Sequence, residues 1–108
     1  DIITREWSGM STKQYKQFKG LKKESLRDNM TNMEIALNML AEASATELSK
    51  QRNPQGFNQQ KRVAKDGGSV AKAARTQLES KLGHKVISPA KASDYLPPVE
   101  NDNIIEEQ

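Results

Sequence analysis

The segment from Thr31 to Gln51 places the tightest limit on how this chain can fold. Thr31 and Glu34 have the spacing of a capping box, in which the hydroxyl and the carboxylate satisfy free backbone N–H groups at the start of a helix. The pattern predicts a helix over residues 32–51. Its core or dimer face follows helical spacing at Met33, Leu37, Leu40 and Leu48.

A second apolar stripe, made of Ile35, Met39 and Ala43, lies on another side of the same helix. The chain has 108 residues, of which only 34% are hydrophobic, so a solitary core would be small. Two apolar sides on one helix are consistent with burial in a single core. They also favour a homodimer, in which a second copy covers one of the two sides.

The N-terminal part of the chain predicts shorter helices. Ser11 suits the cap of a helix over residues 12–19, and a short helical segment is expected over residues 22–29. Residues 1–10 show no period, and we expect them to lead into the first helix. Trp7, the only tryptophan, is expected to pack there as an anchor.

The C-terminal half of the chain is divided by proline and glycine. Residues 53–56 (Asn-Pro-Gln-Gly) end the long helix, because proline cannot continue its hydrogen bonds and glycine accepts left-handed backbone angles. A third helix is predicted over residues 57–65, with a break at residues 67–69. A fourth helix is predicted over residues 70–82, and Gly83 is suited to cap its end.

These segments predict an all-α fold, a small bundle of about four helices with an irregular acidic C-terminal tail. We assign residues 1–91 to a helical interaction domain and residues 92–108 to a proline-containing, largely disordered tail. The first residue is Asp1 rather than methionine, and we expect this domain to be the C-terminal part of a longer protein. All 17 lysines and arginines lie in residues 1–91, with 9 of the 14 acids.

A basic body of this kind attracts polyanions, of which DNA or RNA is the first candidate, and an acidic protein surface would satisfy the same electrostatics. Flexible cations gathered on one face are sufficient for contacts with phosphates. The alternative is that the lysines only solvate the surface. Two clusters are the predicted nucleic-acid contacts: Lys19, Lys22, Lys23 and Arg27 in the first, and Lys61, Arg62 and Lys65 in the second.

The composition argues against an enzyme. There is one histidine, His84, and no cysteine. The chain therefore has too few of the residues that form metal sites with two imidazoles, thiolate sites or Ser-His-Asp triads. No metal, cofactor or catalytic residue is therefore predicted. The absence of cysteine fits a reducing compartment, and no apolar run is long enough to span a membrane, so a cytoplasmic protein is expected.

Three segments carry a family resemblance, namely residues 15–30, 31–37 and 41–49, with the Lys-Gly-Leu-Lys-Lys run of residues 19–23 as the clearest mark. Together with residues 55–60 and the paired glycines that follow, they resemble the C-terminal region of the DNA-damage-inducible protein D family. The resemblance covers about residues 5–98.

This resemblance implies a non-enzymatic bacterial or prophage protein of the SOS response, cytoplasmic and associated with the nucleoid. Full-length members have an N-terminal domain similar to antirepressors of the BRO type. The family is associated with restraint of the RecA recombinase on single-stranded DNA, so the implied partners are DNA, the RecA filament or both. The alternative is an oligomerisation domain that pairs the N-terminal DNA-binding domains.

Overall fold

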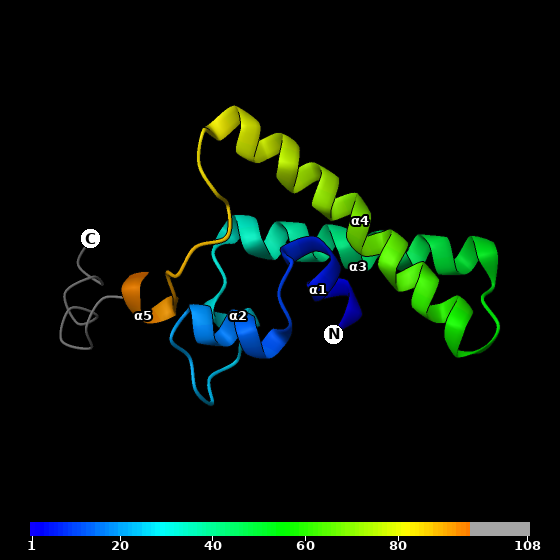
Figure 1. The fold of residues 1–108 in the computed structure, drawn as a ribbon, viewed down its shortest axis with the longest axis horizontal. Coiled ribbons are helices and arrows are strands. Elements are labelled where there is room, and N and C mark those ends of the chain that lie inside the picture. Colours follow the sequence, from blue (N-terminus) through cyan, green and yellow to red (C-terminus); the bar gives the residue numbers. More distant parts are fainter. Residues whose placement is uncertain (96–108) are drawn as a thin grey trace, which may run out of the picture.

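The computed structural model describes residues 1–95, which form helices joined by turns and irregular loops (Figure 1). No strand occurs in these residues, so the predicted all-α class is confirmed. Four of their helices have seven residues or more, in agreement with a bundle of about four helices. In chain order the elements are α1 (Ile2–Ser8), α2 (Thr12–Phe18), the 3-10 turn η1 (Arg27–Asn29), α3 (Asn32–Arg52), α4 (Gly56–Leu82) and α5 (Ala92–Tyr95).

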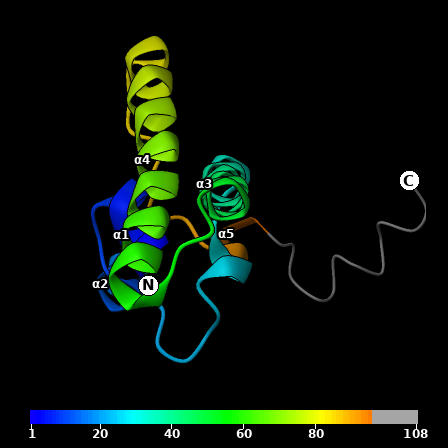
Figure 2. The ribbon, with the colours of Figure 1, turned by 90° about the vertical axis from the view of Figure 1, so that its right-hand side faces the viewer.

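The two long helices, α3 and α4, cross each other and form the frame of the structure (Figure 1). The view from the side shows α1, α2 and α4 on one side of α3 (Figure 2). α1 packs against both long helices near the crossing. The core therefore lies between α3 and the layer that contains α1 and α4.

The helix ends carry the caps that the sequence predicts. The Thr31 hydroxyl accepts from the Glu34 N–H at 3.2 Å, while the Glu34 carboxylate accepts from the Thr31 N–H at 2.7 Å. Ser11 caps α2 with the same reciprocal pattern. Asn53, in the left-handed region at φ 48°, ends α3. These caps satisfy backbone groups that have no partner inside the helix.

The paired glycines do not interrupt α4, so the predicted break at residues 67–69 is wrong. Gly67 and Gly68 are buried where α4 meets its neighbours. A Cβ at Gly67 would lie 2.6 Å from the Cβ of Ala45 in α3, and one at Gly68 would lie 2.6 Å from the Cβ of Glu6 in α1. Glycine is present here because a side chain would push the helices apart.

Residues 2–8 form the helix α1, which the sequence did not predict. Asp1 caps α1, since its carboxylate accepts from the Thr4 N–H at 2.8 Å. Trp7 is fully buried, which confirms its role as an anchor. Its indole N–H donates to Asn38 Oδ1 at 3.0 Å. Its ring packs edge to face against the Tyr15 ring, with 6.2 Å between the two ring centroids. One large aromatic side chain thus attaches α1 to the core.

The segment between α2 and α3 is mostly irregular. The predicted helix over residues 22–29 is reduced to the single turn η1, so that prediction is wrong for most of its length. Leu26 and Met30 are nevertheless buried in the core, as is Leu21 at the start of the segment. Three buried apolar side chains therefore hold this loop in place without helical backbone.

Only part of the predicted apolar face of α3 is in the core. Leu37 is buried and Leu48 is half-buried, but Met33 and Leu40 are 43% and 38% exposed. These two residues are therefore outside the core of residues 1–95, and only the dimer alternative remains for them. The inner side of α3 is shared by small and polar residues instead, since Ala41, Ala45, Glu34 and Asn38 are buried. A hydrophobic pattern cannot reveal this, because buried polar residues take positions that the pattern assigns to solvent.

The residues after α4 turn back onto the core. Val86 and Ile87 are buried, and the Glu79 carboxylate accepts from the Val86 N–H at 2.9 Å. Burial alone would raise the pKa of Glu79, but this hydrogen bond and that from Arg75 outweigh burial and lower the pKa below its ordinary value. Glu79 therefore joins α4 to the returning segment as a carboxylate.

The first four residues assigned to the tail, 92–95, form α5 rather than disordered chain, so the predicted boundary at residue 91 is too early. The Ala92 N–H donates to Asn29 Oδ1 at 2.9 Å, and α5 contacts η1. Residues 96–108 of the predicted tail lie outside the described residues. Within residues 1–95, no helix combines the length and apolarity that a membrane span requires.

Candidate nucleic-acid interface

Lys19, the expected centre of the first basic cluster, is buried and is not available to a phosphate. Its ammonium group donates to the Glu34 carboxylate at 2.8 Å and to the backbone oxygens of Ser88 and Ala90 at 2.8 and 2.5 Å. These three bonds use all three ammonium protons. The side chains of Lys19 and Glu34 are both 0% exposed. The prediction of Lys19 as a nucleic-acid contact is therefore wrong.

Glu34 is the centre of a buried polar cluster that joins distant parts of the chain. Besides Lys19, the hydroxyl of Tyr15 and the backbone N–H groups of Thr31 and Ser88 donate to its carboxylate. Burial raises the pKa of the Tyr15 phenol far above its usual range, and the Glu34 carboxylate raises it further. The phenol is thus a fixed hydrogen-bond donor, and the cluster has a structural role.

The other three cations of the first cluster lie on the surface. Lys22 is exposed and lines a shallow hollow beside α2, together with Lys13 and Lys16. Lys23 is exposed in the following loop. The Arg27 guanidinium is 3.2 Å from the Glu42 carboxylate, and both side chains are about half exposed. This ion pair reduces the positive charge that Arg27 could offer to a phosphate.

The second predicted cluster is assembled as the sequence suggested. Lys61, Arg62 and Lys65 are exposed and line one hollow on the outer side of α4, with Asn58 and Ser69. Two acids, Glu6 and Asp66, also line this hollow. Asp66 is paired with Arg52 at 2.6 Å. In residues 1–95, none of the three predicted cations forms an ion pair within 4 Å of an acid.

One cation of this surface, Lys72, was not part of either predicted cluster. Lys72 is exposed, and it follows Lys61 and Lys65 on the same side of α4 because the three positions are spaced i, i+4 and i+11. This spacing applies only if the helix is continuous. The predicted break at residues 67–69 therefore hid Lys72 from the cluster. We call Lys61, Arg62, Lys65 and Lys72 the α4 basic face.

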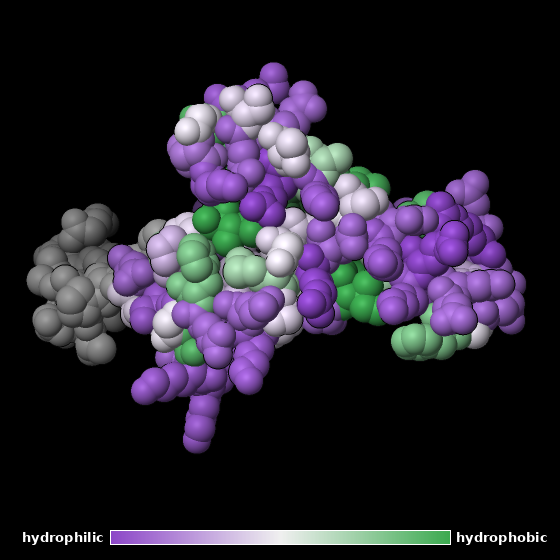
Figure 3. Space-filling view, viewed as in Figure 1, coloured by the Kyte–Doolittle hydropathy of each residue, from purple (hydrophilic) through white to green (hydrophobic). Residues whose placement is uncertain are grey.

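The two basic regions lie in different parts of the molecule. In Figure 1, α2 is at the lower left and the first half of α4 is at the right. Figure 3 shows hydrophilic side chains over both regions, with apolar groups on the surface between them. The α4 basic face is thus a separate surface, and it carries the densest set of cations on one helix.

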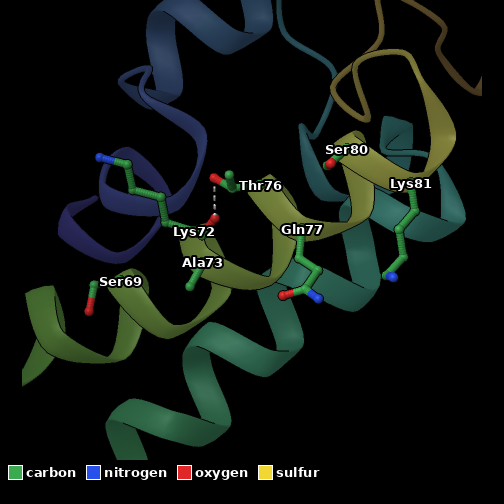
Figure 4. A pocket seen from close by; sticks show the side chains of 7 residues that line it. All are labelled: Ser69, Lys72, Ala73, Thr76, Gln77, Ser80 and Lys81. Carbon is green, nitrogen blue, oxygen red and sulfur yellow. Dashed lines mark hydrogen bonds between the residues drawn. The ribbon is translucent and has the colours of Figure 1, made fainter.

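The hollow over the second half of α4 does not have the features of a catalytic site. It is lined by small and polar side chains, and Figure 4 shows that Lys72 and Lys81 point in different directions and do not converge. The Thr76 hydroxyl is bonded to the Lys72 backbone oxygen at 3.0 Å. Within residues 1–95, no three of the residues His, Cys, Asp and Glu form a group that could hold a metal ion.

No family model, no curated protein and no solved structure matches this chain.

Proposed function

We propose that this chain is a non-enzymatic module that binds the phosphate backbone of nucleic acid, DNA in the first place, against the α4 basic face. One observation carries the proposal. Four exposed cations lie along one helix, and none of them has an acidic partner within 4 Å among residues 1–95. Cations without partners at the surface are free to neutralise phosphates, and the release of counterions then favours binding.

The dimensions of α4 suit a backbone contact. Lys61 and Lys72 are separated by about 16 Å along the axis, at 1.5 Å per residue. Duplex DNA carries one charge per about 1.7 Å of its axis, so several phosphates fall within this length. Two polar residues that line the same hollow, Asn58 and Ser69, can add hydrogen bonds to phosphate or sugar. Binding by such a surface would depend little on base sequence.

The family resemblance supplies a biological setting for this proposal. In that setting the module belongs to a bacterial or prophage regulator of the SOS response with an antirepressor-like N-terminal domain. It acts on DNA, on the RecA filament that forms on single-stranded DNA, or on both. The excess of basic over acidic residues in residues 1–91 supports an attraction to either of these polyanionic partners.

The proposal is tested by fluorescence anisotropy of a labelled oligonucleotide over a series of salt concentrations. We expect the logarithm of the affinity to fall linearly with the logarithm of the salt concentration. The double variant that combines Lys61→Ala and Lys65→Ala should have a shallower salt dependence. The slope should decrease in magnitude by about 0.9 for each phosphate that is no longer neutralised. The matched control is Lys22→Ala with Lys23→Ala, which removes two exposed lysines elsewhere. An equal reduction of affinity in the two double variants would contradict the assignment to α4.

Assembly of a homodimer through α3 is the second candidate function, and a specific observation favours it. Met33, Leu40 and Met39 are exposed on α3. Met33, Ala36, Leu40 and Ala43 form an exposed row with the a and d spacing of a helix pair, and Met39 lies beside it. A second copy of α3 is the proposed occupant. Sedimentation equilibrium should give twice the monomer mass, and Leu40→Glu should halve it. A monomer in the unmodified protein at high concentration would contradict this candidate.

A further inference from the structure

Phe57 is the large apolar side chain with the greatest exposure in the described part of the chain. It lies in the first turn of α4 and is 72% exposed, compared with 46% for Phe18 in α2. Gly56 precedes it in the left-handed region at φ 78°, and a Cβ at Gly56 would meet nothing within 4 Å. At 72% exposure, most of the Phe57 side chain is uncovered by residues 1–95. It makes little contribution to the core of residues 1–95.

Phe57 lies in line with the α4 basic face. Lys61 follows it by four residues and Lys65 by eight, so the three side chains are on the same side of the helix, about 6 Å apart along the axis. An aromatic ring thus continues a row of cations. The ligand that suits such a row carries regularly spaced negative charge together with flat apolar groups.

Single-stranded nucleic acid has both of these properties. Its phosphates can lie along the cations, and its unpaired bases can stack on an exposed aromatic ring. In a duplex the bases are already paired and stacked, so a ring at the surface of a helix cannot reach their faces. We propose that Phe57 is a base-stacking residue and that the α4 basic face prefers single-stranded over double-stranded nucleic acid. This inference rests on the proposed function.

The first experiment compares Phe57→Ala with the unmodified protein by anisotropy on a labelled single-stranded oligothymidine. Stacking is worth about 1–3 kcal/mol per base, so the affinity should fall by about 5-fold to 150-fold. The salt slope should not change, because the variant keeps every cation. Phe18→Ala is the matched control, since it makes the same change at an exposed aromatic residue outside α4. It should leave the affinity unchanged.

The second experiment gives a direct signal for stacking. Phe57→Trp should retain the affinity, and its tryptophan should be quenched when oligothymidine binds. Trp7 is fully buried, so its emission should not respond. An abasic oligonucleotide of the same length should bind Phe57→Ala and the unmodified protein equally well and should not quench the new tryptophan. Each of these results supports base stacking.

The outcomes separate this inference from the proposed function. If Phe57→Ala binds the oligothymidine as tightly as the unmodified protein while Lys61→Ala with Lys65→Ala weakens binding, backbone contact stands and stacking is wrong. If Phe57→Ala weakens duplex and single-stranded binding equally, stacking is also overturned. If the unmodified protein binds neither form at low salt, the proposed function itself fails. Burial of Phe57 in a dimer would appear as a change of mass in Phe57→Ala, and it would overturn the inference.

Discussion

Lys19→Met should lower the free energy of unfolding by about 3–5 kcal/mol, the usual cost of removing one partner from a buried ion pair. In this variant the Glu34 carboxylate stays buried without its cation, and the backbone oxygens of Ser88 and Ala90 have no donor. The total free energy of unfolding of a domain is about 5–15 kcal/mol, so this loss is a large fraction of the stability of the domain. Urea denaturation followed by circular dichroism measures the change.

Two further variants separate the effect of the buried charge from a general loss of packing. Lys22→Met makes the same chemical change at an exposed lysine and should alter stability by less than about 0.5 kcal/mol. Glu34→Gln in the Lys19→Met background removes the unpaired charge but keeps a side chain that can cap α3, and it should restore part of the stability. A Lys19→Met protein as stable as Lys22→Met would contradict the buried pair.

Trp7→Ala should have a similar effect, about 3–5 kcal/mol, because it leaves a cavity where a fully buried indole was packed. Asn38 Oδ1 would also be without its bond from the indole N–H, and Tyr15 would be without its edge-to-face neighbour. At about 4–8 °C per kcal/mol, the melting temperature should fall by more than about 12 °C. Thermal unfolding followed by circular dichroism measures this shift.

The control for Trp7 is Phe18→Ala, which removes an aromatic ring that is 46% exposed. Phe18→Ala should lower the melting temperature much less than Trp7→Ala, because less apolar surface is transferred to water. Trp7→Phe should fall between the two, since it keeps most of the packing but removes the hydrogen bond to Asn38. Similar melting temperatures for Trp7→Ala and Phe18→Ala would show that α1 does not depend on this anchor.

The sequence was most informative where a signal is local. The capping box at Thr31, the end of α3 at Asn53 and the cap of α4 at Gly83 all depend on residues within a few positions of one another. The second basic cluster was found for the same reason. Lys61, Arg62 and Lys65 are neighbours in the chain, and any helical backbone brings them together.

The sequence was misleading where the role of a residue depends on a distant one. Lys19 has the appearance of a surface cation until Glu34 and the backbone of Ser88 surround it. Gly67 has the appearance of a helix breaker until Ala45 lies against it. In both cases the partner is more than ten residues away, and a local pattern contains no information about it.

Local sequence therefore determined the helical class, both ends of α3, the C-terminal cap of α4 and the grouping of Lys61, Arg62 and Lys65. These features follow from spacing and backbone chemistry within one or two turns. Tertiary structure alone decided which cations remain at the surface, which side of α3 is buried, and that α4 continues through Gly67 and Gly68. The physical reason is that burial and close packing are properties of pairs of segments, and their free energy exceeds the local preferences that a single segment expresses.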